Sequence, residues 1–186
     1  MRGWARIARK GRLPVGYLAT ALLLGLGRGG SRGTLIGALP FLGGVGLRLW
    51  AAGHLRKNRE LTTSGPFAHL RHPLYLGTLL VGLGYAIMSG RRWGLPLVLG
   101  LFLAFYLPTM VEEERHLEGL FGERYREYKR NVPMLLPRLS PWRGGGRRRF
   151  DLGLLKKNRE HLWALYNLGV FALFVVANSI GGRRRK

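Results

Sequence analysis

Two charged motifs in this 186-residue chain carry residue types that suit the binding of a small charged molecule. The first is Arg71-His72-Pro73, with Tyr75 two residues further on. Proline suits the first position of a helix, because its backbone angle is fixed and it has no amide hydrogen to leave unpaired. The free amides and positive dipole end of such a helix, beside Arg71 and His72, would favour an anion such as a carboxylate or phosphate.

The second motif is acidic and begins with three consecutive glutamates, Glu112 to Glu114. Six of the nine acidic residues fall between Glu112 and Glu127. The segment predicts a helix, weakened at Gly122, with an apolar stripe formed by Leu117, Leu120, Phe121, Tyr125 and Tyr128. One interpretation is a solvated helix whose acids are offset by arginines. The other is a site that needs negative charge for a cationic ligand.

Together the two motifs suit a ligand that carries both a carboxylate and a fixed positive charge. S-adenosylmethionine is such a ligand. The motifs can share one ligand only if the elements between them bring them to the same side of the molecule.

Five long uncharged runs indicate those elements. A membrane-spanning helix needs roughly 17–25 mostly apolar residues. The last three runs reach that length, the second does so if it continues past Arg48 to Gly53, and the first is short and interrupted by glycine. We therefore predict an all-α, multi-pass membrane protein with about five spans: Leu13–Gly27, Gly33–Leu47, Pro73–Gly90, Trp93–Val111 and Leu162–Gly182. A long side chain such as Arg48 can reach the headgroups from near a helix end.

The positive charges predict the orientation. Residues 1–12, 54–72 and 112–161 carry 5, 4 and 13 Lys and Arg, against 8 in the other loops and the tail, with Arg48 inside a span. Loops rich in Lys and Arg face the cytoplasm. Both motifs are therefore expected at the cytoplasmic face. The basic tail Arg183–Lys186 disagrees with this topology, which places it outside. The expected location is the cell inner membrane.

Three regions follow from the composition: a membrane core at 1–140, a basic cytoplasmic linker at 141–160, and an added hydrophobic helix with a basic tail at 161–186. The linker is expected to lie on anionic lipid headgroups. A net charge of +22 would suit nucleic acid, but the basic residues lie between apolar blocks, so no nucleic-acid partner is expected. The chain has no cysteine, which excludes disulfides and thiolate metal sites, and no metal is expected.

Between Leu47 and Pro137 the chain resembles the isoprenylcysteine carboxyl methyltransferase and phospholipid methyltransferase superfamily. The matching motifs are Leu-Arg-Leu-Trp-Ala at 47–51, Leu-Thr-Thr-Ser-Gly-Pro-Phe at 61–67, Arg-His-Pro-Leu-Tyr-Leu-Gly at 71–77, and Glu113-Glu114 followed by Phe121-Gly122, Tyr125, Tyr128 and Val132-Pro133. The resemblance implies a helical membrane enzyme with a cytoplasmic pocket for S-adenosylmethionine.

The resemblance also implies roles for individual residues. The cofactor pocket would be lined by His72, Pro73, Leu74 and Tyr75, with Leu61, Thr62 and Phe67 on the adenosyl side. Glu113 would hold the amino group or ribose of the cofactor. Arg71 would orient a substrate carboxylate, and Glu114 is the second candidate catalytic residue. The acceptor would be lipidic or prenylated, with carboxyl O-methylation favoured. Eukaryotic members carry an arginine where this chain has Thr109, which argues against prenylcysteine in particular.

Alternative functions remain open at this stage. A phospholipid N-methyltransferase would need a proton acceptor, for which Glu114, His69 and His116 are candidates. A reductase of the sterol type would bind NADPH, but the acids at 113 and 114 would repel its phosphates. A non-enzymatic membrane protein would bind no cofactor. A membrane anchor associated with DNA is supported only by the basic linker and tail.

Overall fold

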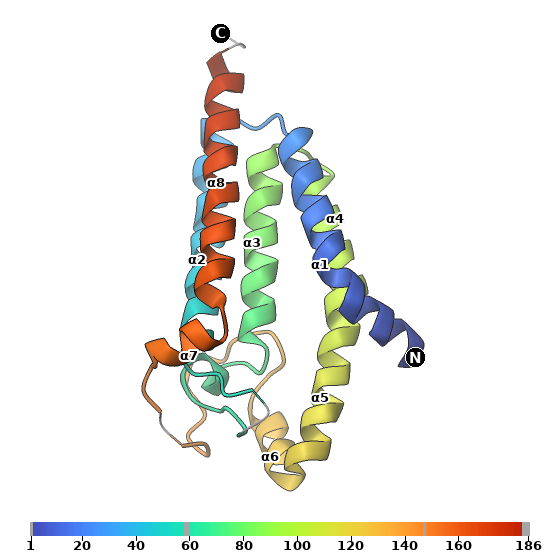
Figure 1. The fold of residues 1–186 in the computed structure, drawn as a ribbon, viewed down its shortest axis with the longest axis vertical. Helices are drawn as coiled ribbons and strands as arrows, with labels where there is room; N and C mark the ends of the chain where they lie inside the picture. The colour runs from blue at the N-terminus through green and yellow to red at the C-terminus, as the bar shows by residue number, and fades with distance from the viewer. Residues whose placement is uncertain (1, 58–59, 147, 184–186) are drawn as a thin grey trace.

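The computed structural model describes residues 2–57, 60–146 and 148–183, and the described part is helical without strands (Figure 1). The chain forms a bundle of long helices with a group of loops and short helices at one end. In chain order the elements are α1 (Arg2–Gly25), α2 (Ser31–Ala52), the 3-10 turn η1 (Gly65–Ala68), α3 (Pro73–Ser89), α4 (Gly94–Leu101), the π-helical segment η2 (Phe102–Tyr106), α5 (Leu107–Phe121), α6 (Glu123–Asn131), α7 (Leu152–Lys157) and α8 (Glu160–Arg183).

Three helical stretches are long and apolar enough to cross a membrane: Ser31–Ala52, Gly94–Phe121 and Glu160–Ile180. The apolar helix α3 is shorter, at 17 residues. Helix α1 combines a basic N-terminal half with an apolar C-terminal half, and it packs against α3, α4 and α5. The all-α, multi-pass architecture is therefore confirmed, with three of the five predicted spans meeting the length and hydropathy of a span in full.

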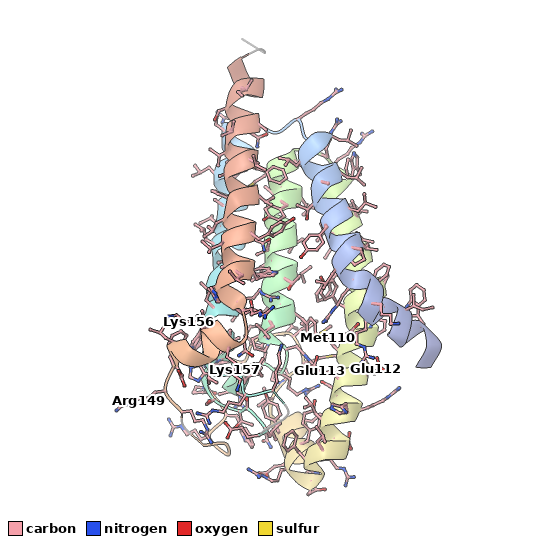
Figure 2. All side chains as sticks on the ribbon, in the orientation of Figure 1. Met110, Glu112, Glu113, Arg149, Lys156 and Lys157 are labelled. Carbon is pink, nitrogen blue, oxygen red and sulfur yellow. The ribbon has the colours of Figure 1, made fainter. Side chains whose placement is uncertain are left out.

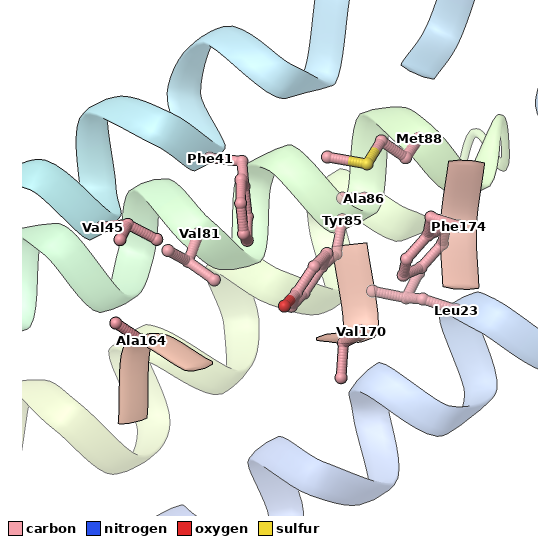
Figure 3. Packing of buried hydrophobic residues seen from close by; sticks show 10 residues of the cluster. All are labelled: Leu23, Phe41, Val45, Val81, Tyr85, Ala86, Met88, Ala164, Val170 and Phe174. Atoms are coloured by element: carbon pink, nitrogen blue, oxygen red, sulfur yellow. The ribbon is translucent and has the colours of Figure 1, made fainter. Parts of the chain in front are cut away.

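Helices α2 and α3 pack with their backbones in contact, because glycines face one another at two levels. A Cβ atom at Gly37 would lie 2.6 Å from the Gly84 carbonyl oxygen, and one at Gly44 would lie 2.5 Å from that of Gly77. Small residues allow this approach between membrane helices. Phe41, which lies between these two levels on α2, packs at a tilt against Tyr85, and Tyr85 stacks on Phe174, which joins α2 and α3 to α8 (Figure 3).

A local break in the ladder of helix hydrogen bonds separates α4 from α5. Pro108 has no amide hydrogen, so the carbonyl of Ala104 loses its usual partner four residues later. The indole Nε1 of Trp4 donates to that carbonyl at 3.2 Å, and the Leu107 amide bonds to Phe102, five residues back. The π-helical segment thus follows from one proline, and it fixes the start of α1 against η2.

Arg48 lies inside α2, which continues to Ala52 as predicted. Its guanidinium is paired within the protein: Nη2 and Nε donate to the Glu160 carboxylate at 2.7–3.0 Å, and Nη1 donates to the Leu74 carbonyl at 3.1 Å and the Thr78 hydroxyl at 2.6 Å. The Trp163 ring lies 3.9 Å from the guanidinium carbon. One arginine therefore joins α2, α3 and α8.

The basic segments predicted to share one face lie together. The start of α1, the loop after α2, and α6 with the loops that follow it occupy one end of the bundle (Figure 1). The segment after α6 runs beside the loop before α3, with the amides of Arg71 and His72 donating to the carbonyls of Pro133 and Met134 at 2.9 and 3.1 Å. Region 141–160 contains α7, whose first amides are capped by the Asp151 carboxylate. Residues 184–186 of the basic tail lie outside the described residues.

Removing one partner of the Arg48–Glu160 pair should destabilise the fold. Both side chains are about nine-tenths buried, and a buried charge left unpaired costs about 3–5 kcal/mol. We expect Arg48→Met and Glu160→Leu each to lower the thermal midpoint of the detergent-purified protein by several degrees. The double variant should recover much of the loss, since neither charge is then left alone.

The exposed Arg126–Glu123 pair supplies the control. Arg126→Met should leave the midpoint close to that of the wild type, because exposed ion pairs contribute little. If the single variants of Arg48 and Glu160 have the same thermal midpoint as the wild type, this pair is not a structural link.

Candidate functional site

The two motifs meet at the loop-bearing end of the bundle. Helix α3 begins at Pro73, directly after His72, as the sequence predicts. Tyr75, two residues after this proline, donates a hydrogen bond from its hydroxyl to Glu113 Oε2 at 2.8 Å. Figure 2 shows Glu112 and Glu113 on α5, close to the start of α1. The helical hairpin thus places the head of α3 and the acidic part of α5 within reach of one small ligand.

Glu114 is buried, and its carboxylate lies among three basic groups. Arg71 Nε donates to Oε1 at 2.7 Å, and His72 Nε2 lies 3.2 Å from the same oxygen. Lys129 Nζ, from α6, lies 3.4 Å from Oε2. Glu114 is 6% exposed. The sequence predicts that an anion lies beside Arg71 and His72 at the start of α3. In the structure the carboxylate of Glu114 lies there.

Arg71 also joins the loop before α3 to α6. Its Nη1 donates to the backbone carbonyls of Lys129 and Val132. Two of its three guanidinium nitrogens, Nε and Nη1, are thereby engaged with the protein. The role predicted for Arg71, orienting a substrate carboxylate, would fall to the remaining nitrogen.

Tyr75 has a second polar partner that sequence reasoning missed. Arg12 Nη1, from α1, donates to the Tyr75 hydroxyl at 2.8 Å, so that Arg12, Tyr75 and Glu113 form a chain of hydrogen bonds in one direction. The Tyr106 ring lies edge-on to Tyr75 at 5.9 Å, and the His72 ring lies 5.5 Å away. Arg12 belongs to no motif. Its only sequence signal is its place at the boundary between the basic start and the first apolar run.

The other predicted cofactor residues face different neighbours. Pro73 is fully buried, and the Leu74 carbonyl accepts the hydrogen bond from Arg48. Leu61 packs on the cluster of Tyr125, Tyr128 and Val132. Thr62 accepts a hydrogen bond from the Arg56 amide at 3.3 Å, and the Phe67 carbonyl accepts one from the Tyr128 hydroxyl at 2.7 Å. These three contacts join the loop to α6 and to itself, whereas Tyr75 contacts Arg12 of α1 and Glu113 of α5.

Leu61 and Thr62 also line a cavity of about 210 Å³ between this loop and α6. Its polar walls include Arg124, Glu127 and Trp142. Leu61 and Thr62 thus have an open polar space beside them, as a binding role requires.

The predicted helix after the glutamates breaks at Gly122, which has a positive φ of 53° and lies between α5 and α6. Tyr125 and Tyr128 of the predicted stripe are buried, and burial raises the pKa of both hydroxyls, so both stay protonated at neutral pH. The placement of Leu120 in the stripe is wrong: it is 51% exposed, because the turn at Gly122 rotates α6 away from the line of α5.

Neighbouring glutamates should behave differently when neutralised. Glu114→Gln leaves Arg71 and Lys129 without their counter-charge in a buried place, and we expect a loss of about 3–5 kcal/mol, seen as a lower thermal midpoint. Glu113→Gln keeps a hydrogen-bond acceptor for Tyr75 at a more exposed position and should leave the midpoint nearly unchanged. Equal midpoints for the two variants would contradict the assignment of Glu114 to the fold.

Known proteins resemble this chain in sequence over its central part. Residues 34–124 match the phospholipid methyltransferase family. The cobalt-zinc-cadmium resistance protein CzcN of Cupriavidus metallidurans is 38% identical over 143 residues, which cover 72% of this chain and 64% of the relative. The protein-S-isoprenylcysteine O-methyltransferase of Schizosaccharomyces pombe is 31% identical over 81 residues, covering 44% of this chain and 34% of the relative.

A third relative, the methanethiol S-methyltransferase of Crocosphaera subtropica, is 36% identical over 79 residues, covering 42% of this chain and 29% of the relative. The chain thus spans less than two thirds of the length of these curated relatives. No solved structure matches it. The matched residues include the head of α3 and all three glutamates, and over them the chain is similar to the superfamily of isoprenylcysteine carboxyl methyltransferases and phospholipid methyltransferases.

Proposed function

We propose that the chain is an integral membrane methyltransferase that uses S-adenosylmethionine and acts on a lipidic or prenylated acceptor, with carboxyl O-methylation favoured. The observation that supports it is the hydrogen bond between Tyr75 and Glu113, which joins the two family motifs at the end of the bundle. The loops at that end carry most of the Lys and Arg, so the proposed site faces the cytoplasm.

The residues around Tyr75 fit such a cofactor. Glu113 offers a carboxylate that is held by a neutral hydroxyl rather than by a cation, so it keeps its charge for the amino group or ribose. The rings of His72, Tyr75 and Tyr106 provide flat surfaces beside it. We assign His72, Pro73, Leu74, Tyr75 and Glu113 to cofactor binding, with Leu61, Thr62 and Phe67 on the adenosyl side.

S-adenosylmethionine supplies a methyl group bound to a positively charged sulfur. Transfer requires an in-line approach of the acceptor, so the protein contributes alignment and exclusion of water. A carboxylate acceptor is already ionised at neutral pH and needs no base. Arg71, through its remaining guanidinium nitrogen, would orient it, and Glu114 would hold Arg71 and His72 in position.

The environment of Glu114 favours an acid as acceptor over an amine. An amine must lose a proton, and Glu114 was one candidate to accept it. A carboxylate that receives a hydrogen bond from Arg71 and lies beside His72 and Lys129 is stabilised in its charged form, which makes it a poor proton acceptor. Acceptance of a proton by Glu114 is therefore not part of the proposed reaction.

Ligand-induced stabilisation tests the cofactor. We expect S-adenosylmethionine and S-adenosylhomocysteine to raise the thermal midpoint of the purified protein, and NADPH to leave it unchanged; a ligand at 100 times its dissociation constant adds about 2.7 kcal/mol. Glu113→Gln should weaken the binding of S-adenosylmethionine and of S-adenosylhomocysteine at least tenfold. Glu118→Gln, five residues further along α5, serves as the matched control and should behave like the wild type.

Stabilisation by NADPH alone would assign the chain to the reductases, and stabilisation by none of the three would favour a non-enzymatic protein. Transfer of labelled methyl groups into a membrane lipid extract then separates a methylated acid, whose ester is cleaved by mild base, from a methylated amine, which resists it.

A further inference from the structure

A cavity of about 130 Å³ lies among α1, α3, α4 and α8. Its walls are mainly aliphatic and aromatic, and they include Gly16, Tyr17, Gly82, Val98, Trp163 and Tyr166. Two of these helices, α1 and α8, lie outside the residues that match the family, so this space is built largely by parts of the chain that the family motifs do not describe.

Among the residues that line the cavity, Arg12 alone carries a formal charge. It is also the residue that donates a hydrogen bond to Tyr75 in the candidate site. Tyr106, edge-on to Tyr75, lines the cavity as well. The apolar space therefore reaches the proposed methyl-transfer site at a single cation.

The cavity meets the surface of the bundle between α1 and α8. Tyr17 and Tyr166 contact each other edge to face across this seam, with ring centroids 5.4 Å apart. Both line the cavity and both are about half exposed, at 51% and 46%. A molecule dissolved in the bilayer can therefore approach the cavity from the side, past two aromatic rings.

We infer that this cavity holds the hydrocarbon chain of the methyl acceptor, and that Arg12 pairs with the acceptor's acidic head group. The inference rests on the proposed function and adds the place and the chemical class of its acceptor: a single-chain amphiphile with one carboxylate. Apolar walls exclude a second charged group along the chain. The lone cation at the edge favours an acid over an amine of equal length.

The test is equilibrium binding of radiolabelled palmitic acid to the full-length protein in nanodiscs, with unlabelled competitors. Affinity should rise roughly two- to fourfold for each methylene added among short straight-chain acids, until the cavity is filled. Alkylamines of the same lengths should compete at least tenfold less well. Arg12→Gln should remove this difference between acids and amines.

A variant whose side chain fills the cavity provides a second test of the inference. A Cβ atom at Gly16 meets nothing closer than the Tyr106 hydroxyl at 4.0 Å, so Gly16→Leu places its side chain in the space without a backbone clash. We expect palmitic acid to bind at least tenfold more weakly to it. Gly43→Leu is the matched control, because Gly43 is exposed on α2 with open space around it, and should bind like the wild type. Thr20→Leu narrows the same cavity if Gly16→Leu does not fold.

Each outcome separates this inference from the proposed function. Stabilisation of the wild type by S-adenosylhomocysteine, together with equal palmitic acid binding by wild type, Gly16→Leu and Thr20→Leu, would overturn the inference and leave the proposed function standing. Phosphatidylglycerol competing as well as palmitic acid would also overturn it, since the cavity would then be a site for a structural lipid. Palmitic acid binding without any stabilisation by S-adenosylhomocysteine would contradict the proposed function on which the inference rests.

Discussion

A buried carboxylate must be neutralised, and the arrangement of the whole loop-bearing end follows from how this is done for Glu114. Its three basic neighbours come from the loop before α3 and from α6, so one side chain of α5 holds both segments. Arg71 extends this contact to the backbone at the end of α6, through the carbonyls of Lys129 and Val132. The head of α3 is thereby placed against α5, and Tyr75 comes within hydrogen-bond distance of Glu113.

Successive residues of an α-helix point about 100° apart, so three consecutive glutamates cannot share one task. Glu114 faces the loops and contacts three basic side chains, whereas Glu113 accepts a hydrogen bond from Tyr75. One oxygen of Glu112 is buried without a hydrogen-bond partner among the described residues. The two interpretations of the acidic run, structural charge and ligand-binding charge, therefore apply to different members of it.

The sequence was sufficient for the helical architecture and for the meeting of the two motifs, because both rest on local signals. Uncharged runs mark helices, Pro73 marks a helix start, and Gly122 marks a break. It was insufficient where a partner comes from far along the chain. Arg12 and Tyr75 are 63 residues apart, and Arg48 and Glu160 are 112 apart, with no spacing rule to connect them. The predicted stripe assumed one continuous helix, so the sequence did not show that the chain turns at Gly122 and leaves Leu120 exposed.

The backbone contact between α2 and α3 decides which parts of the bundle can move. Two helices whose glycines touch at two levels lose close packing at both levels when they move apart, which favours their moving as one unit. Helix α1 is joined to this pair by a short turn, with the Arg28 amide bonded to the Ser89 carbonyl. Helix α8 is joined to the same pair through Glu160 and Phe174. Lateral exchange of a long-chain molecule would thus require α1 to tilt away from α8 while α2, α3 and α8 stay together. The exchange rate would then depend on how tightly the surrounding lipids are packed, and would slow in an ordered bilayer.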